Sequence, residues 1–190
     1  MILRTSRLIL TPRTLADTEA CLAMDREPEV TKFVDGPWDD PAAHRAFIEA
    51  RTLGPYPAGL GYWTIRSLAE RDAFLGWALL IPVDAEGPEI EIGWRLRPRA
   101  WGRGFASEAA LALLRYGFDE LGLEEIIAEI DARNAASIRV AEKLGMRRGE
   151  TFESPTRPWV RYSVGREETT PGPRRSASAC WAPRRSRRRR

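Results

Sequence analysis

The sequence predicts an α/β protein of the mixed α+β kind, in which strands and helices share one sheet. Residues 89–96 alternate apolar and polar side chains, as a half-buried strand does. An apolar-periodic helix over 106–121 follows that strand and is followed by a strand over 126–130. Two further apolar strands, over 62–66 and 73–81, are separated by a short polar segment that is typical of a hairpin. Helix-bridged and hairpin connections together indicate a mixed sheet.

The other predicted elements each have a local signal. Pro12 ends the first strand, and Thr14 is a suitable start for the first helix. Loops rich in glycine and proline, over 35–41 and 54–61, border the second helix. Asn134 is a good N-cap for the last helix. In chain order these elements are a strand over 7–12, helices over 14–24, 42–53 and 135–144, and strands near 147–152 and 159–164.

Charge divides the chain into a folded domain, residues 1–168, and a tail, residues 169–190. The tail is composed mainly of Pro, Gly, Ser, Ala and Arg and is predicted to be disordered. Its eight arginines account for the basic character, because without them the formal net charge of +3 becomes −5 for residues 1–171. Nucleic acid would therefore bind only through this tail, which is otherwise a dispensable extension. The acidic domain suits a cationic substrate.

Several classes of protein are disfavoured. No segment reaches the length of a membrane span, so no membrane partner is expected. Cys21 and Cys180 lie far apart, and no cluster has metal-ligand spacing, so neither a disulfide framework nor a metal is expected. A reduced, cytoplasmic protein fits these features. The single histidine, His44, has no catalytic partner at a meaningful spacing and is expected on the surface of its helix.

The segment after the strand 89–96 is the strongest functional signal. It reads Arg99-Ala-Trp-Gly102-Arg-Gly104 and leads directly into a helix. Glycines allow the backbone to approach a ligand closely, and the free N–H groups of a helix start favour an anion. The sequence therefore predicts a phosphate cradle made of main chain.

Two other phosphate-binding turns were compared with this segment. A P-loop requires Gly-Lys-Ser/Thr, where this chain has Phe105 and Ala106 after Gly104. A dinucleotide-binding turn requires a third glycine, where this chain has Ser107. Because Asp131 ends the next strand, as a ribose-binding acid would, the second alternative stays open.

A second segment, with Asn134-Ala-Ala-Ser137 and Lys143-Leu-Gly145, follows the next strand. With both segments in this order, the chain resembles the GCN5-related N-acetyltransferases (GNAT) over roughly residues 5–166. In that family an Arg/Gln-x-x-Gly-x-Gly/Ala turn holds the pyrophosphate of acetyl-coenzyme A (acetyl-CoA). The resemblance implies a GNAT fold, with a central mixed, mostly antiparallel sheet that is splayed at its middle and flanked by about four helices.

The predicted strand Glu91-Ile-Gly-Trp-Arg-Leu96 is similar to the corresponding strand in one branch of the family, the enzymes that acetylate the N-termini of ribosomal proteins. The resemblance implies that the main chain of the turn binds the cofactor. Arg99 would add charge to these contacts and Ser107 a hydroxyl, and Asn134 would contact the pantetheine arm. The residues implied in acetyl-CoA binding are Arg99, Gly102, Arg103, Gly104, Phe105, Ala106, Ser107 and Asn134.

The resemblance also implies the catalytic residues. Glu91 is similar to the family's general base. Glu89 is the second candidate, because it lies two residues away and so on the same face of the predicted strand. Ser137 is similar to the residue that protonates or hydrogen-bonds the departing thiolate, and the position of the commoner tyrosine is Ala141 here. We expect Ser137 to lie where the strands that carry Glu91 and residues 126–130 diverge.

The expected activity is an N-acetyltransferase that moves an acetyl group from acetyl-CoA to a primary amine by direct transfer. The amine belongs to a protein N-terminus, that of a ribosomal protein included, or to a small molecule. The alternatives are a non-catalytic acyl-CoA-binding protein and a ribosome-associated regulatory protein. A monomer and a homodimer are equally compatible with the sequence.

Overall fold

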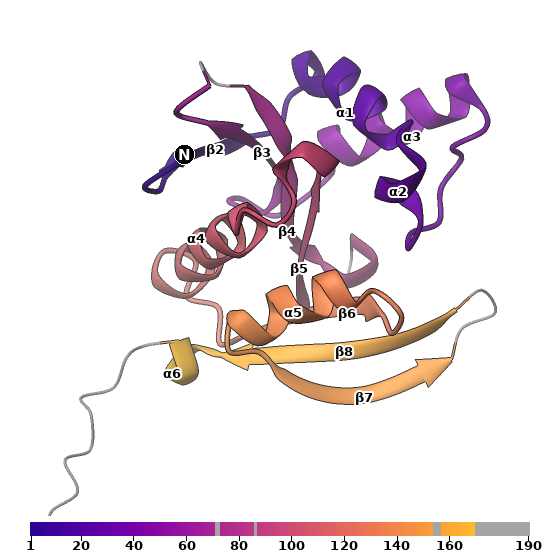
Figure 1. The fold of residues 1–190 in the computed structure, drawn as a ribbon. Helices are drawn as coiled ribbons and strands as arrows, with labels where there is room; N and C mark the ends of the chain where they lie inside the picture. Colours follow the sequence, from indigo (N-terminus) through magenta and orange to yellow (C-terminus); the bar gives the residue numbers. More distant parts are fainter. Residues whose placement is uncertain (71–72, 86, 154–156, 170–190) are drawn as a thin grey trace, which may run out of the picture.

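The computed structural model describes residues 1–70, 73–85, 87–153 and 157–169. Figure 1 shows one curved sheet with helices packed against it. The sheet has eight strands in the order β1-β2-β3-β4-β5-β6-β8-β7. Its strands are β1 (Leu3–Arg4), β2 (Leu8–Pro12), β3 (Gly61–Ser67), β4 (Phe74–Pro82), β5 (Ile90–Leu96), β6 (Glu125–Asp131), β7 (Arg147–Glu153) and β8 (Pro158–Gly165). Its α-helices are α1 (Thr18–Asp25), α2 (Pro28–Thr31), α3 (Pro41–Leu53), α4 (Phe105–Asp119), α5 (Ala135–Lys143) and α6 (Arg166–Thr169).

The centre of the sheet is its weakest pairing. Six of the seven neighbouring strand pairs are antiparallel, and β5 and β6 form the one parallel pair. The parallel pair consists of a single register position, Glu91 opposite Ile127. Beyond it, β5 continues along β4 and β6 continues along β8. The mixed, mostly antiparallel sheet splayed at its middle is therefore confirmed.

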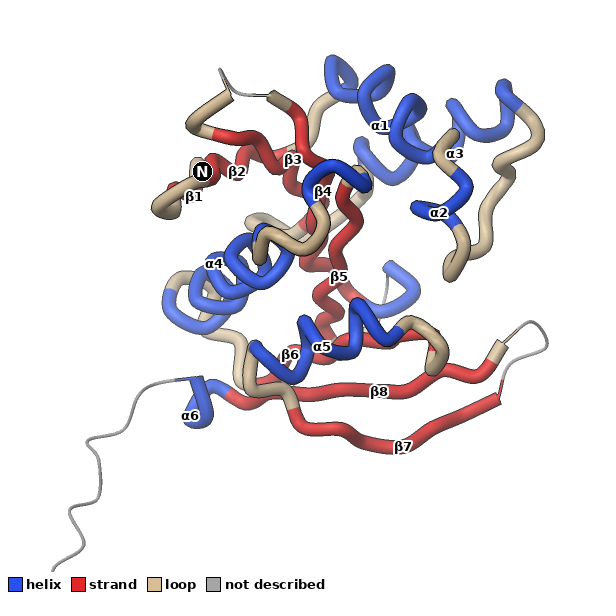
Figure 2. The backbone as a smooth tube through the Cα atoms, viewed as in Figure 1, coloured by secondary structure: helices blue, strands red, loops and turns tan. Residues whose placement is uncertain are grey.

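The two faces of the sheet carry separate cores. Trp63, Leu80 and Ile92 belong to the core under α4. Their neighbours on the opposite face, Tyr62 and Trp77 among them, belong to a second core with α1 and α3. Figure 2 shows α4 and α5 crossing the sheet, while α1, α2 and α3 gather beyond β4 and β5. Because side chains alternate along a strand, β3 and β4 are buried on both faces.

The helix beginnings follow local chemistry. Asp40 is the N-cap of α3 and accepts hydrogen bonds from the main-chain N–H groups of Ala42 and Ala43, at 2.9 and 3.0 Å. Pro41 occupies the first turn of α3, where its missing N–H costs nothing. Asn134 caps α5 in the same way, as its sequence indicates.

Some features differ from the expectations drawn from the sequence. The two-residue β1 and the one-turn α2 were not expected, because such short elements depend on their neighbours. The expectation that His44 lies on the surface was wrong. Its side chain is only 3% exposed, and its Nε2 lies 3.4 Å from a carboxylate oxygen of Asp25, which is also buried.

Among the helices within the described ranges, none combines the length and the apolar character needed to cross a membrane. Apart from Thr169, which ends α6, the predicted arginine-rich tail lies outside the described residues.

Candidate active site

The glycine turn has the geometry of a main-chain cradle. Gly102 and Gly104 adopt left-handed φ angles of +71° and +78°, which favour glycine. Gly104 is the N-cap of α4 and accepts the first intrahelical bond, from the N–H of Glu108 at 3.0 Å. The N–H groups of the three helical residues before Glu108 therefore have no partner within the helix. A Cβ on Gly102 would have no heavy atom within 4 Å, so the space above the turn is open.

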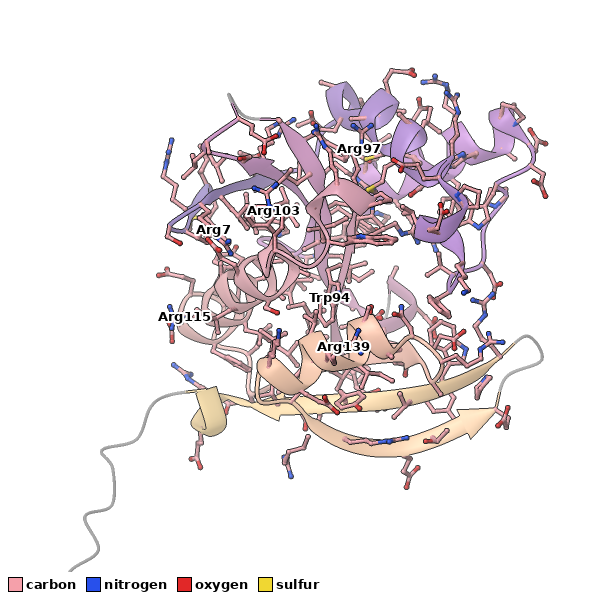
Figure 3. All side chains as sticks on the ribbon, in the orientation of Figure 1. Arg7, Trp94, Arg97, Arg103, Arg115 and Arg139 are labelled. Atoms are coloured by element: carbon pink, nitrogen blue, oxygen red, sulfur yellow. The ribbon has the colours of Figure 1, made fainter. Side chains whose placement is uncertain are left out.

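Arg7 holds this turn in place from the bend between β1 and β2. Its Nη1 donates to the carbonyl of Arg103 at 3.0 Å, and its Nε donates to Glu108 at 2.7 Å. The Arg7 guanidinium also lies 4.6 Å from the ring centroid of Phe105. Figure 3 shows Arg7 and Arg103 beside the start of α4. The cradle is thus fixed by contacts within the protein.

Burial would raise the pKa of Glu108, but hydrogen bonds from Thr5, Arg7 and Ser6 outweigh it and hold the pKa below its usual value. The carboxylate is therefore charged at neutral pH. It is an anchor for the N-terminal segment and not a group free to titrate.

A cavity of about 490 Å³ opens above the cradle. Its walls come from the turn, α2, β5 and α5, and they include four cationic side chains, Lys32, Arg95, Arg139 and Lys143. A helix start among cations suits an anionic, phosphate-bearing ligand. The predicted cofactor residues that line this cavity are Gly102, Gly104, Phe105, Ala106, Ser107 and Asn134.

The two arginines of the turn are placed differently from the glycines. Arg99 donates from Nη2 to the carbonyl of Phe74 at 3.1 Å and is not among the described residues that line the cavity. The Arg103 side chain lies over the ring of Phe105 at 4.7 Å, with its Nη1 3.5 Å from a carboxylate oxygen of Glu70. The structure does not bring the charge of Arg99 to the ligand site, whereas the expected contact from Arg103 is a main-chain one.

A second cavity, of about 810 Å³, lies on the face of the sheet that carries α1 and α3. Glu91 and Ser137 both line it, and so does Asn134. Ser137, Asn134 and Trp94 also line the smaller cavity, so the two cavities meet beside the start of α5. This is where β5 and β6 separate.

Asn134 and Ser137 are linked directly. The Asn134 side-chain oxygen accepts a hydrogen bond from the main-chain N–H of Ser137 at 3.1 Å. That bond caps α5 and leaves the Ser137 hydroxyl as the group that this residue can offer to a ligand. The N-cap role inferred for Asn134 from the sequence is confirmed.

Glu91 has the environment of a base. Burial, reinforced by the nearby charge of Glu129, raises its pKa to about 7. A hydrogen bond from the main-chain N–H of Glu129 opposes this rise, as does the more distant charge of Arg161. Among the described residues, Glu91 has no ion-pair partner within 4 Å, and its carboxylate faces the larger cavity.

Glu89, the reserve candidate, is engaged elsewhere. Arg161 donates to both of its carboxylate oxygens, at 2.9 and 3.1 Å, and the Glu89 side chain is 46% exposed. The same arginine pairs with Glu129 at 2.6 Å. The geometry therefore favours Glu91 over Glu89 as the group that titrates near neutrality.

The dinucleotide-binding alternative does not fit the structure. Such a fold requires a mainly parallel sheet, whereas only one pair is parallel here. Asp131, the candidate ribose ligand, is instead bonded by Arg133 at 2.7 Å, and that hydrogen bond lowers its pKa.

Other residues of the larger cavity were not identified from the sequence. Arg13 follows β2, Arg51 lies near the end of α3, and Asp84 precedes β5, yet all three line this cavity. Asp84 has a positive φ of 54°, uncommon for a residue other than glycine. No local motif marks these residues, because packing of distant segments brings them together. Residues 154–156, between β7 and β8, lie outside the described residues.

Comparison with known proteins identifies one family. Residues 7–147 match the family model of the acetyltransferase (GNAT) domain. A relative from Aspergillus fumigatus, FsC-acetyl coenzyme A-N(2)-transacetylase, is 35% identical, and the alignment covers 96% of this chain and 87% of the relative.

Solved structures agree. An acetyltransferase of the GNAT family from Bacillus anthracis has a TM-score of 0.75 at 27% identity, over 88% of this chain and 100% of that one. A Vibrio cholerae structure, provisionally described as a ribosomal-protein-serine acetyltransferase, has a TM-score of 0.68 at 19% identity, over 87% of this chain and 97% of that one. At that identity the likeness extends to the fold alone.

The open cradle leads to a test of coenzyme A binding. Gly104→Val would place branched carbon above the helix start and force an unfavourable backbone angle, so coenzyme A affinity should fall at least tenfold, about 1.4 kcal/mol. Isothermal titration calorimetry measures this loss directly.

Gly122→Val is the matched control. Gly122 also has a left-handed φ, +68°, and a Cβ added there would have no heavy atom within 4 Å, but this glycine lines neither cavity. The variant should lose stability and keep its coenzyme A affinity. Equal affinity in folded Gly104→Val and wild type would contradict the cradle.

Proposed function

The chain belongs to the GNAT acetyltransferases and is an acetyl-CoA-dependent N-acetyltransferase, and from this premise we propose that it transfers the acetyl group directly to a primary amine. In this proposal Glu91 is the general base, and Ser137 stabilises the departing thiolate. The observation that carries the proposal is the position of Glu91. Its carboxylate has a pKa of about 7 and faces the same cavity as Ser137.

Acetyl-CoA supplies the activated acetyl group as a thioester. The helix start at Phe105, Ala106 and Ser107 offers main-chain donors for its pyrophosphate, and Gly102 and Gly104 leave room for close approach. Lys32, Arg139 and Lys143 add positive charge to the walls, an arrangement suited to a polyanionic ligand. The described residues hold no group of three or more potential metal ligands, and the proposal requires no metal.

Glu91 removes a proton from the amine, directly or through water. An amine arrives mainly as a cation and has to lose a proton before its lone pair can attack a carbonyl. A base whose pKa lies near neutrality is well suited to this step, because it is partly deprotonated and still basic. The carboxylates of Asp84 and Glu129 line the same cavity and favour a cationic amine over an anion there.

Ser137 donates its hydroxyl hydrogen toward the sulfur as negative charge develops on it. A serine hydroxyl is a weak acid at neutral pH, so this role is hydrogen-bond stabilisation and not full proton donation. Ala141, where many relatives carry a tyrosine, is fully buried in the core. A tyrosine there would overpack the core and would not replace the serine.

Direct transfer is favoured over a covalent intermediate on the enzyme. Cys21 is the cysteine among the described residues; it is fully buried, and burial raises its pKa to about 11. A thiol with that pKa is almost entirely protonated at neutral pH and is a poor nucleophile.

The acceptor amine belongs to a small molecule or to a protein N-terminus. The relative named as an N(2)-transacetylase supports nitrogen as the accepting atom. The resemblance of the strand Glu91–Leu96 to the ribosomal-protein branch keeps a ribosomal N-terminus among the candidates.

Glu91→Gln tests the base. The substitution keeps the size and removes the carboxylate, so the rate at pH 7 should fall by about 10²–10⁴-fold. The wild-type rate should rise with pH through about 7, as Glu91 loses its proton. In the variant the bend near pH 7 should be absent, and the rate should instead rise steadily with the neutral fraction of the amine, so that the deficit shrinks at high pH. Thiol release measured from pH 5.5 to 9.5 gives both profiles.

Glu89→Gln is the control, because it removes a carboxylate that directly precedes β5 and is held by Arg161. It should leave the pH profile unchanged. A wild-type rate in Glu91→Gln at neutral pH would overturn the assignment and transfer the role to Glu89 or to water.

Ser137→Ala tests the thiolate contact. The rate should fall by roughly 5- to 150-fold, about 1–3 kcal/mol, because charge on sulfur develops only as the bond breaks. Coenzyme A affinity should change little. Ser163→Ala, which removes a half-buried hydroxyl on β8 outside both cavities, should have no effect on the rate. Weaker coenzyme A binding at an unchanged rate would instead make Ser137 a cofactor-positioning residue.

A further inference from the structure

Arg13 is a buried cation in the wall of the larger cavity. Its side chain is only 6% exposed, yet it lines the cavity that Glu91 also lines. The main-chain N–H of Arg13 donates to the carbonyl of Tyr62 at 2.8 Å, which fixes the residue beside β3. Its guanidinium carbon lies 3.9 Å from the ring centroid of Tyr62 and 5.9 Å from that of Trp77. Aromatic faces therefore hold the guanidinium in place.

The protein supplies Arg13 with no carboxylate. Among the described residues, none lies within ion-pair distance of its guanidinium, and its Nε is buried without a hydrogen-bond acceptor. Its Nη2 makes a long bond, 3.4 Å, to the carbonyl of Ile48. Burial lowers the pKa of Arg13, and electrostatic interactions with Cys21 first, then Tyr62, Tyr56 and Asp25, only partly offset this. A buried cation without a counter-ion is costly to keep.

Asp25, the buried carboxylate of the same layer, is already occupied. Its Oδ1 lies 3.0 Å from Nη1 of Arg95, and its Oδ2 lies 3.4 Å from Nε2 of His44. Arg95 thus has a counter-ion, whereas Arg13 has not. Within the described part of the protein the Arg13 side chain bonds only neutral groups, the Cys21 thiol and the carbonyl of Ile48, so an anion that enters the cavity would be its first charged partner.

The cavity is polarised. Arg51, whose guanidinium lies 3.8 Å from the ring centroid of Phe47, adds a second cation to the walls near Arg13. Tyr62, which accepts a hydrogen bond from Arg51, and Tyr56 add phenolic groups. Acidic side chains line the part of the wall formed by β5 and β6, where Glu91 lies. Cations and acids therefore occupy different ends of one space.

The strand register gives the distance between these ends. Tyr62 lies opposite Leu79, and Leu79 lies opposite Gly93, so the ring under Arg13 belongs to a strand two positions from β5. Two strand spacings are about 10 Å, and Glu91 lies two residues along β5 from that row. With about 7 Å for those two residues, the backbone positions of Tyr62 and Glu91 are roughly 12 Å apart, so several carbon atoms are needed to span from the guanidinium over Tyr62 to the carboxylate of Glu91. An α-amino acid, in which one carbon joins the amine to the carboxylate, is too short to reach both.

We propose, on the basis of the function proposed above, that the acceptor carries an anionic oxygen group of the carboxylate class, joined to its reacting amine by a chain of several carbon atoms, and that Arg13 binds this group. The guanidinium forms charge-assisted hydrogen bonds to the carboxylate, while Glu91 receives the amine at the other end of the cavity. Arg13 acts on acceptor binding and takes no part in the bond-making step.

A series of ω-amino acids and their amides tests this assignment. Acids from 4-aminobutanoate to 10-aminodecanoate vary the separation of the two groups, and each primary amide keeps the length without the charge. In the wild type, kcat/KM should be largest for a long member of the acid series, and it should exceed that of the matching amide by about 10- to 100-fold. A hexylamine reaction measures transfer to an amine that has no second group.

Arg13→Met and Arg13→Lys examine the residue itself. Arg13→Met should remove most of the preference for the acid by raising KM for the acid, with the amide and hexylamine almost unchanged. Arg13→Lys should restore part of it. Arg45→Met, on the exposed side of α3, removes an arginine that pairs with Glu19 and Glu49 outside the cavity and should keep the full preference. Coenzyme A affinity and the thermal midpoint show whether each variant is folded.

If Arg13→Met does not fold, the wild type alone still decides the question. Octanoate should then inhibit acetylation of hexylamine competitively, and octanamide should not. Equal rates for acids and amides at every length, together with no inhibition by octanoate, would overturn the proposal. If the Arg13 proposal fails in this way, acetylation of hexylamine that depends on Glu91 would still support the proposed function. The absence of thiol release with every amine would refute the proposed function itself.

Discussion

The structure depends on the single parallel contact between β5 and β6, at Glu91 and Ile127. Beyond this position β5 follows β4 and β6 follows β8, so the sheet opens instead of continuing flat. The helices after both strands, α4 and α5, begin at this opening and direct their first turns toward the two cavities. A longer parallel ladder would close the space in which the thioester and the amine have to meet. The proposed base, Glu91, thus lies at the position where the two halves of the sheet join.

Alternation along β5 places its side chains on both faces of the sheet. Ile92 and Leu96 pack in the core under α4, the helix whose start forms the cradle. Glu91 and Gly93 line the cavity on the opposite side. Gly93 has little room for a side chain, because a Cβ there would lie 3.2 Å from the side chain of Leu79. The two cavities nevertheless share a wall, which is formed by Phe33, Val34, Trp94, Arg95, Asn134 and Ser137.

Features set by neighbouring residues could be predicted from the sequence, and features set by distant ones could not. The strand that carries Glu91, the glycine turn before α4 and the cap at Asn134 each depend on a few consecutive residues. The burial of His44 and the unpaired state of Arg13 depend instead on the packing of α1 and α3 against β3 and β4. The charge of Arg99 was expected at the cradle, but its bond to Phe74 depends on the end of β4. For the same reason the cationic end of the acceptor cavity has no sequence signal.

The pKa of Glu91 tests the account most directly. Carboxyl carbon NMR of protein labelled at glutamate follows each side chain through pH, and loss of one resonance in Glu91→Gln assigns the signal. The account predicts a titration centred at about 7, produced by burial at the join of β5 and β6 and by the charge of Glu129. A titration near the ordinary glutamate value of about 4.3 would contradict it, because the carboxylate would then be well hydrated and a weak base at neutral pH.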